Sequence, residues 1–146
     1  ALAALGELPA VEELTLTDEG MTRYVMTIDE AAGLVLQAAE RMHGGEVFVT
    51  KMQAIRILDL AYAMGELMKR PVHIKKVGLR PGEKLYEELI SAEEREHALD
   101  VGRFLIIPSE RPSDVGAPRP AHVYPDARPV DREWSSAKEA PLSRAE

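Results

Sequence analysis

Apolar residues recur at helical spacing in one long stretch that has a well-marked beginning and end. Thr27 can cap the free amides of a helix, and Glu30, three residues later, completes a capping box. The pattern continues to about Met42 and stops at Gly44 and Gly45. We therefore predict a helix with one apolar face, formed by Ile28, Ala31, Ala32, Val35, Ala38, Ala39 and Met42.

Other segments predict a second long helix, a short helix and several strands. Residues 55–68 are apolar over more than half of a helical circumference and are followed by Pro71, which predicts a helix packed on two sides. Ser91 and Glu94 form a second capping-box pattern, so we expect a short helix to about Leu99. Short alternating or β-rich apolar segments predict strands at 13–18, 46–50, 72–77 and 104–107, with 46–50 buried in a mixed sheet. The fold class is therefore mixed α/β.

Composition fits a soluble globular domain and changes character near the end of the chain. The 146 residues are 45% hydrophobic and 29% charged, with a formal net charge of −7, which argues against nucleic acid as a partner. The absence of cysteine is compatible with a reducing cytoplasm, and no apolar run approaches the length of a membrane span. Prolines recur after residue 107, so we divide the chain into a domain at 1–107 and a Pro-rich polar tail at 108–146.

The stretch 78–89, GLRPGEKLYEEL, carries the clearest candidate chemistry. Pro81 forces Arg80 out of the helical region and suits the first position of a helix, which would place Glu83 in the first turn. Arg80 could then point at an anion near the exposed amides. The plainer alternative is a strand-turn-helix joint with a solvated arginine. Arg23, which follows the turn at Gly20, is open to the same two interpretations.

Three stretches in the same order resemble one family: 21–31 (MTRYVMTIDEA), 41–52 (RMHGGEVFVTKM) and 80–89 (RPGEKLYEEL). They are similar to capsule and polysaccharide biosynthesis proteins related to inverting UDP-N-acetylglucosamine 4,6-dehydratases, in the extended short-chain dehydrogenase/reductase family. The resemblance covers the C-terminal, substrate-binding portion of such an enzyme, with an incomplete Rossmann sheet and three main helices. It implies that Arg23 and Arg80 bind the diphosphate of a UDP-sugar and that Glu83 binds its ribose hydroxyls. Trp134-Ser135-Ser136 is similar to a Tyr-Ser-Ser segment of some members, but it carries no assigned role.

The catalytic features of that family do not occur in this sequence. The family uses NAD(P), held by a glycine-rich turn, and a Tyr-x-x-x-Lys pair for acid/base chemistry. Gly44 and Gly45 fit a helix stop, and none of the four tyrosines has a lysine four residues later. We therefore assign no catalytic, cofactor-binding or metal-binding residue, and we expect the chain alone to be inactive.

Several hypotheses remain open at this point. The first is a UDP-sugar-binding portion of a dehydratase or epimerase, which we expect to be completed by a missing N-terminal half, since the chain begins at Ala1 rather than methionine. The second is a non-catalytic interaction module, or a split or decayed relative of these enzymes, that docks on a partner subunit or forms a homo-oligomer. The third is a structural relic without a ligand.

Overall fold

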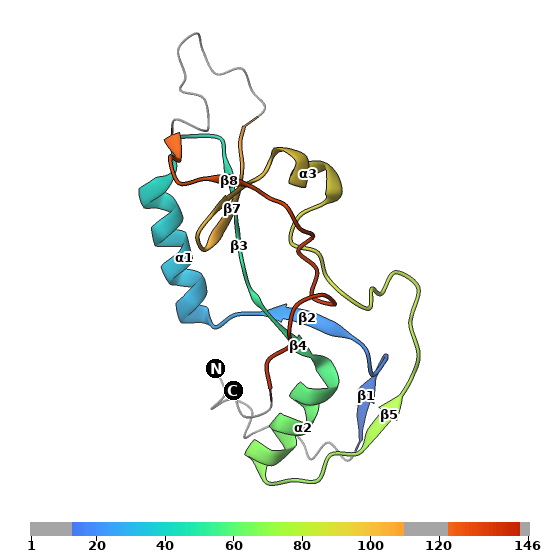
Figure 1. Ribbon diagram of the computed structural model, residues 1–146. Helices are drawn as coiled ribbons and strands as arrows, with labels where there is room; N and C mark the ends of the chain where they lie inside the picture. The colour runs from blue at the N-terminus through green and yellow to red at the C-terminus, as the bar shows by residue number, and fades with distance from the viewer. Residues whose placement is uncertain (1–12, 110–122, 144–146) are drawn as a thin grey trace. The chain divides into compact units, whose positions relative to one another are not determined.

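The computed structural model describes residues 13–109 and 123–143, which divide into two compact units (Figure 1). The first unit combines 13–25, 53–87 and 136–143, and the second combines Met26–Met52 with 88–109 and 123–135. Neither unit is continuous in sequence. Residues 123–143, which composition placed in the tail, contribute to both units.

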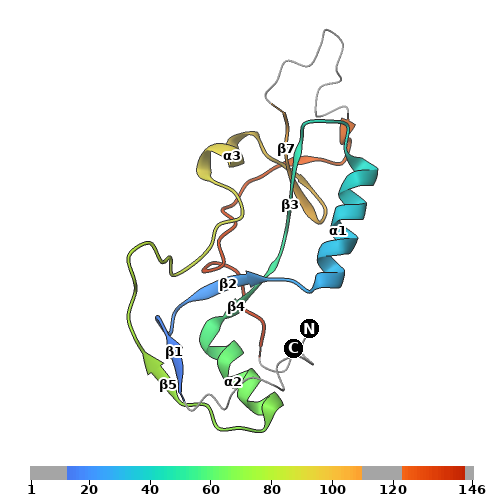
Figure 2. The same ribbon diagram turned by 180° about the vertical axis from the view of Figure 1, so that it is seen from behind.

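The first unit consists of two strand pairs and one long helix. Strands β1 (Leu14–Leu16) and β5 (Ile74–Lys76) pair in parallel, and β2 (Thr22–Val25) pairs antiparallel with β4 (Gln53–Arg56). Helix α2 (Ile57–Met68) packs against β1 and β4, and Figure 2 shows it beside the β1–β5 pair. Among the described residues of this unit, the buried apolar side chains are Leu16, Met21 and Ala54.

A tight turn between β1 and β2 sets the position of Arg23. The Asp18 carboxylate accepts a 2.8 Å hydrogen bond from the Gly20 N–H, and the Met21 N–H donates to the Asp18 carbonyl at 3.2 Å. The Gly20 N–H, with help from Lys76, lowers the pKa of Asp18. The turn therefore fixes where β2 begins, and Arg23 is the second residue of that strand.

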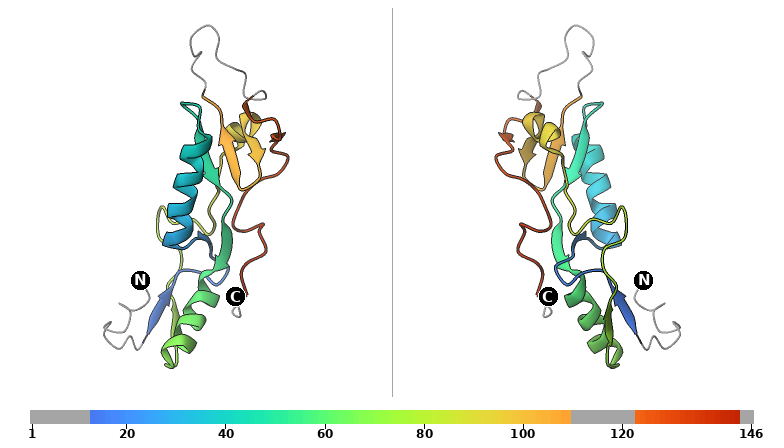
Figure 3. Two further views of the ribbon diagram at one scale, coloured as in Figure 1. Left: turned by 90° about the vertical axis from the view of Figure 1, so that its left-hand side faces the viewer. Right: turned by 90° about the vertical axis from the view of Figure 1, so that its right-hand side faces the viewer.

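The second unit is a four-stranded antiparallel sheet with helices on both sides. Its strand order is β3 (Val47–Thr50), β7 (Phe104–Ile107), β6 (Leu99–Val101) and β8 (Arg128–Pro129). Helix α1 (Ile28–Arg41) lies along one face, and α3 (Ala92–His97) lies on the other side (Figure 3).

Side-chain alternation along β7 divides the core of this unit between the two faces of the sheet. Phe104 and Ile106 pack with Leu34 of α1 and with Tyr124. Leu105 points the other way and packs in a second cluster that also contains Ile90, Ala98 and Trp134. Strand β7 pairs with a neighbour on each side, and its Leu105 and Ile106 are fully buried.

The helix signals read from the sequence are confirmed at two N-termini. The Thr27 N–H donates to the Glu30 carboxylate at 2.8 Å, and the Glu30 N–H donates to Thr27 Oγ1 at 3.2 Å. Ser91 and Glu94 form the same reciprocal pair at the start of α3. The mixed α/β fold class with three helices is also confirmed.

Other expectations were wrong, each for a structural reason. Helix α1 buries Leu34, whereas much of the predicted apolar face is exposed, including Ile28 at 76% and Val35 at 68%. Strand β3 lies at an edge of an antiparallel sheet and is only partly buried, so it is not enclosed in a mixed sheet. Residues 53–56 form strand β4 because they pair with β2, so α2 begins later than expected.

Candidate functional site

The RPGE segment forms a β-turn and not the start of a helix, which corrects the sequence-based expectation. Gly82 has a φ of +86°, and the Glu83 N–H donates to the Arg80 carbonyl at 3.0 Å. Proline second and a positive-φ glycine third are the features of a type II turn. The Glu83 carboxylate folds back and accepts the Arg80 N–H at 3.0 Å. The predicted helix dipole is therefore absent at this turn, while Arg80 and Glu83 stay together in an exposed position.

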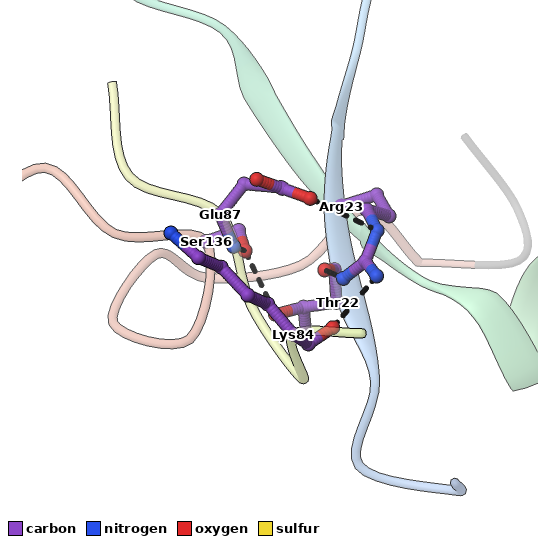
Figure 4. Close-up of polar contacts among 5 residues, drawn as sticks. All are labelled: Thr22, Arg23, Lys84, Glu87 and Ser136. Carbon is purple, nitrogen blue, oxygen red and sulfur yellow. Dashed lines mark hydrogen bonds and ion pairs between the residues drawn. The ribbon is translucent and has the colours of Figure 1, made fainter. Parts of the chain in front are cut away.

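The Arg23 guanidinium is held by three acceptors of the first unit (Figure 4). Nη1 donates to the Thr22 carbonyl at 2.7 Å, and Nη2 donates to the Lys84 carbonyl at 2.7 Å. Nε lies 3.4 Å from a carboxylate oxygen of Glu87. These contacts use Nε and one N–H of each Nη, so each Nη has a second N–H that can donate to an anion.

The contacts bring two of the sequence motifs together. Lys84 directly follows Glu83, so the Arg23 guanidinium is bonded to the backbone next to the Arg80–Glu83 turn. Within the described part of the chain, the Arg80 side chain makes no hydrogen bond or ion pair, and it is exposed. The structure therefore joins Arg23 to the RPGEK segment, although no hydrogen bond or ion pair links the described Arg23 with Arg80 or Glu83.

A buried polar network links the segments that hold the Arg23 guanidinium. Ser136 is fully buried, and its Oγ lies 2.9 Å from Thr22 Oγ1 and accepts the Glu87 N–H at 2.9 Å. The Ser136 N–H donates to the Glu87 carbonyl at 2.9 Å, and the Thr22 N–H donates to the Leu85 carbonyl at 2.9 Å. These bonds tie β2, the 84–87 segment and residue 136 into one framework.

Sequence reasoning missed three parts of this arrangement. Glu87 stands within the RPGEKLYEEL stretch, so its motif was visible although its role was not. The Lys84 contribution is a backbone carbonyl, which side-chain patterns do not reveal. Ser136 was assigned no role, because only the weak Tyr-Ser-Ser similarity pointed to it.

In the second unit, the carboxylate of the RMHGGE stretch holds the loop after helix α1 through hydrogen bonds to its backbone. The Glu46 carboxylate accepts the N–H groups of His43 at 2.9 Å and Gly44 at 2.7 Å, and the Tyr124 hydroxyl donates to it at 3.0 Å. Burial alone would raise the pKa of Glu46, but the surrounding backbone N–H groups and the Tyr124 hydroxyl lower it. Burial, together with the hydrogen bond to Glu46, raises the pKa of Tyr124 to about 12.

Lys51, which had no assigned role, also has structural partners in the second unit. Its ammonium pairs with Asp100 at 2.5 Å and lies 5.0 Å from the centre of the Trp134 ring. Its N–H donates to the Arg103 carbonyl at 3.0 Å. These contacts connect Lys51 to β6, to the turn before β7 and to Trp134, so we interpret it as a structural residue.

The other features of the described residues give no further site. Two surface hollows among the described residues are lined by residues of 62–72 and by residues of 88–95 with 133–134, and none of Arg23, Arg80 or Glu83 lines either one. Within 13–109 and 123–143, no cluster of three or more His, Cys, Asp or Glu residues is arranged to hold a metal ion. In the same residues, no helix is both long enough and apolar enough to cross a membrane.

Comparison with known proteins places these motifs in a family. The model of a family described as polysaccharide biosynthesis protein matches residues 7–109, which is more than half of the chain. The chain belongs to this family. The match includes Arg23 and the whole RPGEKLYEEL stretch but ends before Ser136.

Two proteins similar to this chain carry the names of nucleotide-sugar enzymes. The chain is 37% identical over 106 residues to UDP-glucose 4-epimerase of Rickettsia bellii, covering 73% of this chain and 31% of the relative. It is 39% identical over 83 residues to the inverting UDP-N-acetylglucosamine 4,6-dehydratase of Campylobacter jejuni, covering 57% of this chain and 24% of the relative. The predicted resemblance to dehydratases and epimerases is thereby confirmed.

A solved structure supports the fold. The X-ray structure of Pen from Bacillus thuringiensis aligns with 93% of this chain and 38% of its own, with a TM-score of 0.72 and 31% sequence identity. The mixed α/β arrangement therefore matches part of a larger protein. The chain spans between about a quarter and two fifths of the length of these three proteins.

Proposed function

We propose that this chain is the UDP-sugar-binding portion of a polysaccharide-biosynthesis 4,6-dehydratase or epimerase. The observation that carries the proposal is the hydrogen bond from Arg23 to the Lys84 carbonyl, which joins the MTR motif to the RPGEK motif in one unit. Both relatives named above carry the names of enzymes that act on UDP-sugars, and the family match at residues 7–109 includes both motifs.

The chemistry of each side chain suits a nucleotide diphosphate. The Arg23 side chain ends in a planar guanidinium suited to phosphate oxygens, and each of its Nη groups has an N–H beyond those bonded to carbonyls. Arg80 is exposed at the neighbouring turn and can supply a second positive charge. One oxygen of Glu83 accepts the Arg80 N–H, and its other oxygen can accept from ribose hydroxyls.

The described residues do not fit the NAD(P) that complete members of this enzyme class use. A dinucleotide needs a glycine-rich turn whose amides face its pyrophosphate at a helix N-terminus. In this chain the Gly44 N–H donates to Glu46, and the glycine pair follows the end of α1. We therefore assign no cofactor-binding or catalytic role within this chain.

Calorimetric titration of UDP-N-acetylglucosamine into the full chain tests the proposal. We expect saturable binding that weakens at least tenfold in both Arg23→Ala and Arg80→Ala, since each removes a charged donor to phosphate. Arg56→Ala is the matched control, because Arg56 is an arginine of the same unit that pairs with Asp59. Absence of binding to the unaltered chain, or equal loss in the control, would contradict the proposal.

A specific observation favours a second candidate, an interaction module without ligand chemistry. Helix α1 and the Met42 that caps its C-terminus expose several large apolar side chains: Ile28 at 76%, Val35 at 68%, Leu36 at 67% and Met42 at 56%. Ile28, Val35 and Met42 are spaced by seven residues, which places them on one stripe of the helix. Such a stripe can pair with a second copy of the chain.

Light scattering tests this second candidate. If α1 mediates self-association, the mass should rise with protein concentration and return to that of a monomer in Val35→Glu. Glu40→Lys, an exposed polar position on the same helix, serves as the control. A monomer at all concentrations rules out self-association through α1.

A further inference from the structure

We infer that Ser136 is a positioning residue for Arg23, so that a segment outside the family match completes the proposed nucleotide site. The inference rests on the proposed function for its ligand, but it rests on the geometry of the first unit for its mechanism. The match to the family ends at residue 109, whereas Ser136 lies in the following part of the chain.

The two carbonyls that hold Arg23 belong to two different segments. One is the carbonyl of Thr22 in β2, and the other is the carbonyl of Lys84 in the loop after the Arg80–Glu83 turn. A guanidinium is rigid and planar, so it can donate well to both only while the two segments keep a fixed separation. Whatever ties β2 to the loop therefore also orients Arg23.

The Ser136 side chain connects β2 to the loop. Its Oγ pairs with Thr22 Oγ1 at 2.9 Å and accepts the Glu87 N–H at 2.9 Å. Its own N–H donates to the Glu87 carbonyl at 2.9 Å, so residue 136 binds the loop through both its side chain and its backbone. A direct backbone bond, from the Thr22 N–H to the Leu85 carbonyl, supports the same link between strand and loop.

Burial makes this hydroxyl costly to remove. Ser136 is 0% exposed and Thr22 is 8% exposed, so water cannot easily replace the lost partner of the Glu87 N–H. Ser136→Ala should therefore loosen the loop that carries the Lys84 carbonyl. The Arg23 guanidinium should then lose its fixed orientation, although none of its own acceptors is mutated.

Two measurements on the full chain test this inference separately from the proposed function. Nitrogen NMR of the arginine Nε–H groups, without nucleotide, reports the rigidity of the Arg23 guanidinium. We expect a rigid Arg23 signal in the unaltered chain and a mobile one in Ser136→Ala. Titration with UDP-N-acetylglucosamine should show about fivefold weaker binding in Ser136→Ala, within the range for coupled neighbouring residues.

Control variants separate positioning from general loss of stability. Ser135→Ala removes the neighbouring buried hydroxyl, and it should leave the Arg23 signal rigid. In an Arg23→Ala background, Ser136→Ala should cause no further loss of affinity. If Ser136→Ala does not fold, Thr22→Val replaces it, because this variant removes the hydroxyl partner of Ser136 and keeps the Thr22 carbonyl.

The outcomes are distinguishable. A rigid Arg23 signal and unchanged affinity in folded Ser136→Ala would overturn the inference. A mobile Arg23 signal in Ser136→Ala, combined with no nucleotide binding by any variant, would support the positioning role and overturn the proposed function. An affinity loss of equal size in the Arg23→Ala background would show that Ser136 acts by another route, which also overturns the inference.

Discussion

Arg23 donates a 2.7 Å hydrogen bond from Nη2 to the carbonyl oxygen of Lys84, which is 61 residues further along the chain. Lys84 follows the Arg80–Glu83 turn, so this bond brings one motif of the family next to another. The bond lies within a single compact unit. The proposed nucleotide site, the role of Ser136 and the effect of Glu87 all depend on this relationship.

Glu87→Gln should tighten the binding of a nucleotide diphosphate. The Glu87 carboxylate lies 3.4 Å from Arg23 Nε and is 46% exposed, so it offsets part of the positive charge available to phosphate. Two backbone carbonyls still hold the guanidinium in the variant. For a carboxylate in a water-like dielectric we expect about a two- to threefold gain in affinity for UDP-N-acetylglucosamine, measured by calorimetry.

Glu88→Gln is the matched control for this charge effect, since it removes the same charge from the next residue, which is also exposed. We expect little change in affinity in this control. A loss of affinity in Glu87→Gln would mean that the carboxylate is needed to position Arg23, so the two carbonyls alone would not hold the guanidinium.

Acid should destabilise the chain partly through Glu46. The pKa of Glu46 is lowered below its ordinary value in the folded state by the backbone N–H groups around it, so folding favours the carboxylate. That contribution to the free energy of unfolding is present above the unfolded pKa and is lost as pH falls through the folded pKa. When the pH falls from about 5 to about 3, the free energy of unfolding of the unaltered chain should therefore decrease more than that of Glu46→Gln. Urea unfolding measures both changes.

Tyr124→Phe provides an intermediate case. It removes the hydroxyl that donates to Glu46 but keeps the backbone N–H groups of His43 and Gly44. The loss of stability of Tyr124→Phe in acid should be smaller than that of the unaltered chain and larger than that of Glu46→Gln. Identical acid profiles for all three proteins would contradict the role assigned to Glu46.

Replacing Gly65 or Gly33, two glycines within helices, by alanine should change the free energy of unfolding in opposite directions. A Cβ on Gly65 of α2 would lie 2.2 Å from Val72 Cγ2 and 3.0 Å from the Arg70 carbonyl, so the segment after the helix would have to move. We expect Gly65→Ala to lower the free energy of unfolding by about 1–3 kcal/mol. Chemical denaturation measures this change.

Gly33→Ala is the control in α1, because a Cβ there would meet nothing within 4 Å. Alanine in a helix interior is more favourable than glycine, so we expect this variant to gain about 0.5–1 kcal/mol. If both variants lose stability to the same extent, the close approach of Val72 to Gly65 is not the cause.

Features that depend on neighbouring residues were predictable from the sequence. The capping boxes at Thr27 and Ser91 are closed by residues only three positions away, so local sequence determines them. The Pro81–Gly82 pair shows the limit of such reasoning. Proline suits both the first position of a helix and the second position of a type II turn. The positive φ of Gly82 is incompatible with a helix and fits the turn.

Features that depend on distant pairing were not predictable. Helix α1 has apolar residues on more than one side, and its packing against β7 decides that Leu34 is buried while Val35 is exposed. The site shows the same limit. The MTR and RPGEK motifs indicated Arg23, Arg80 and Glu83 through a family resemblance, but only the fold reveals that Ser136 braces Thr22 and Glu87.

A double-mutant cycle on UDP-N-acetylglucosamine affinity, with Arg23→Ala, Arg80→Ala and the double variant, tests whether the two arginines share one ligand. If both arginines bind one diphosphate next to the Lys84 carbonyl, the loss of binding free energy in the double variant should differ from the sum of the two single losses by at least about 0.5 kcal/mol. Strictly additive losses, or binding that is unaffected by either substitution, would contradict a shared nucleotide site.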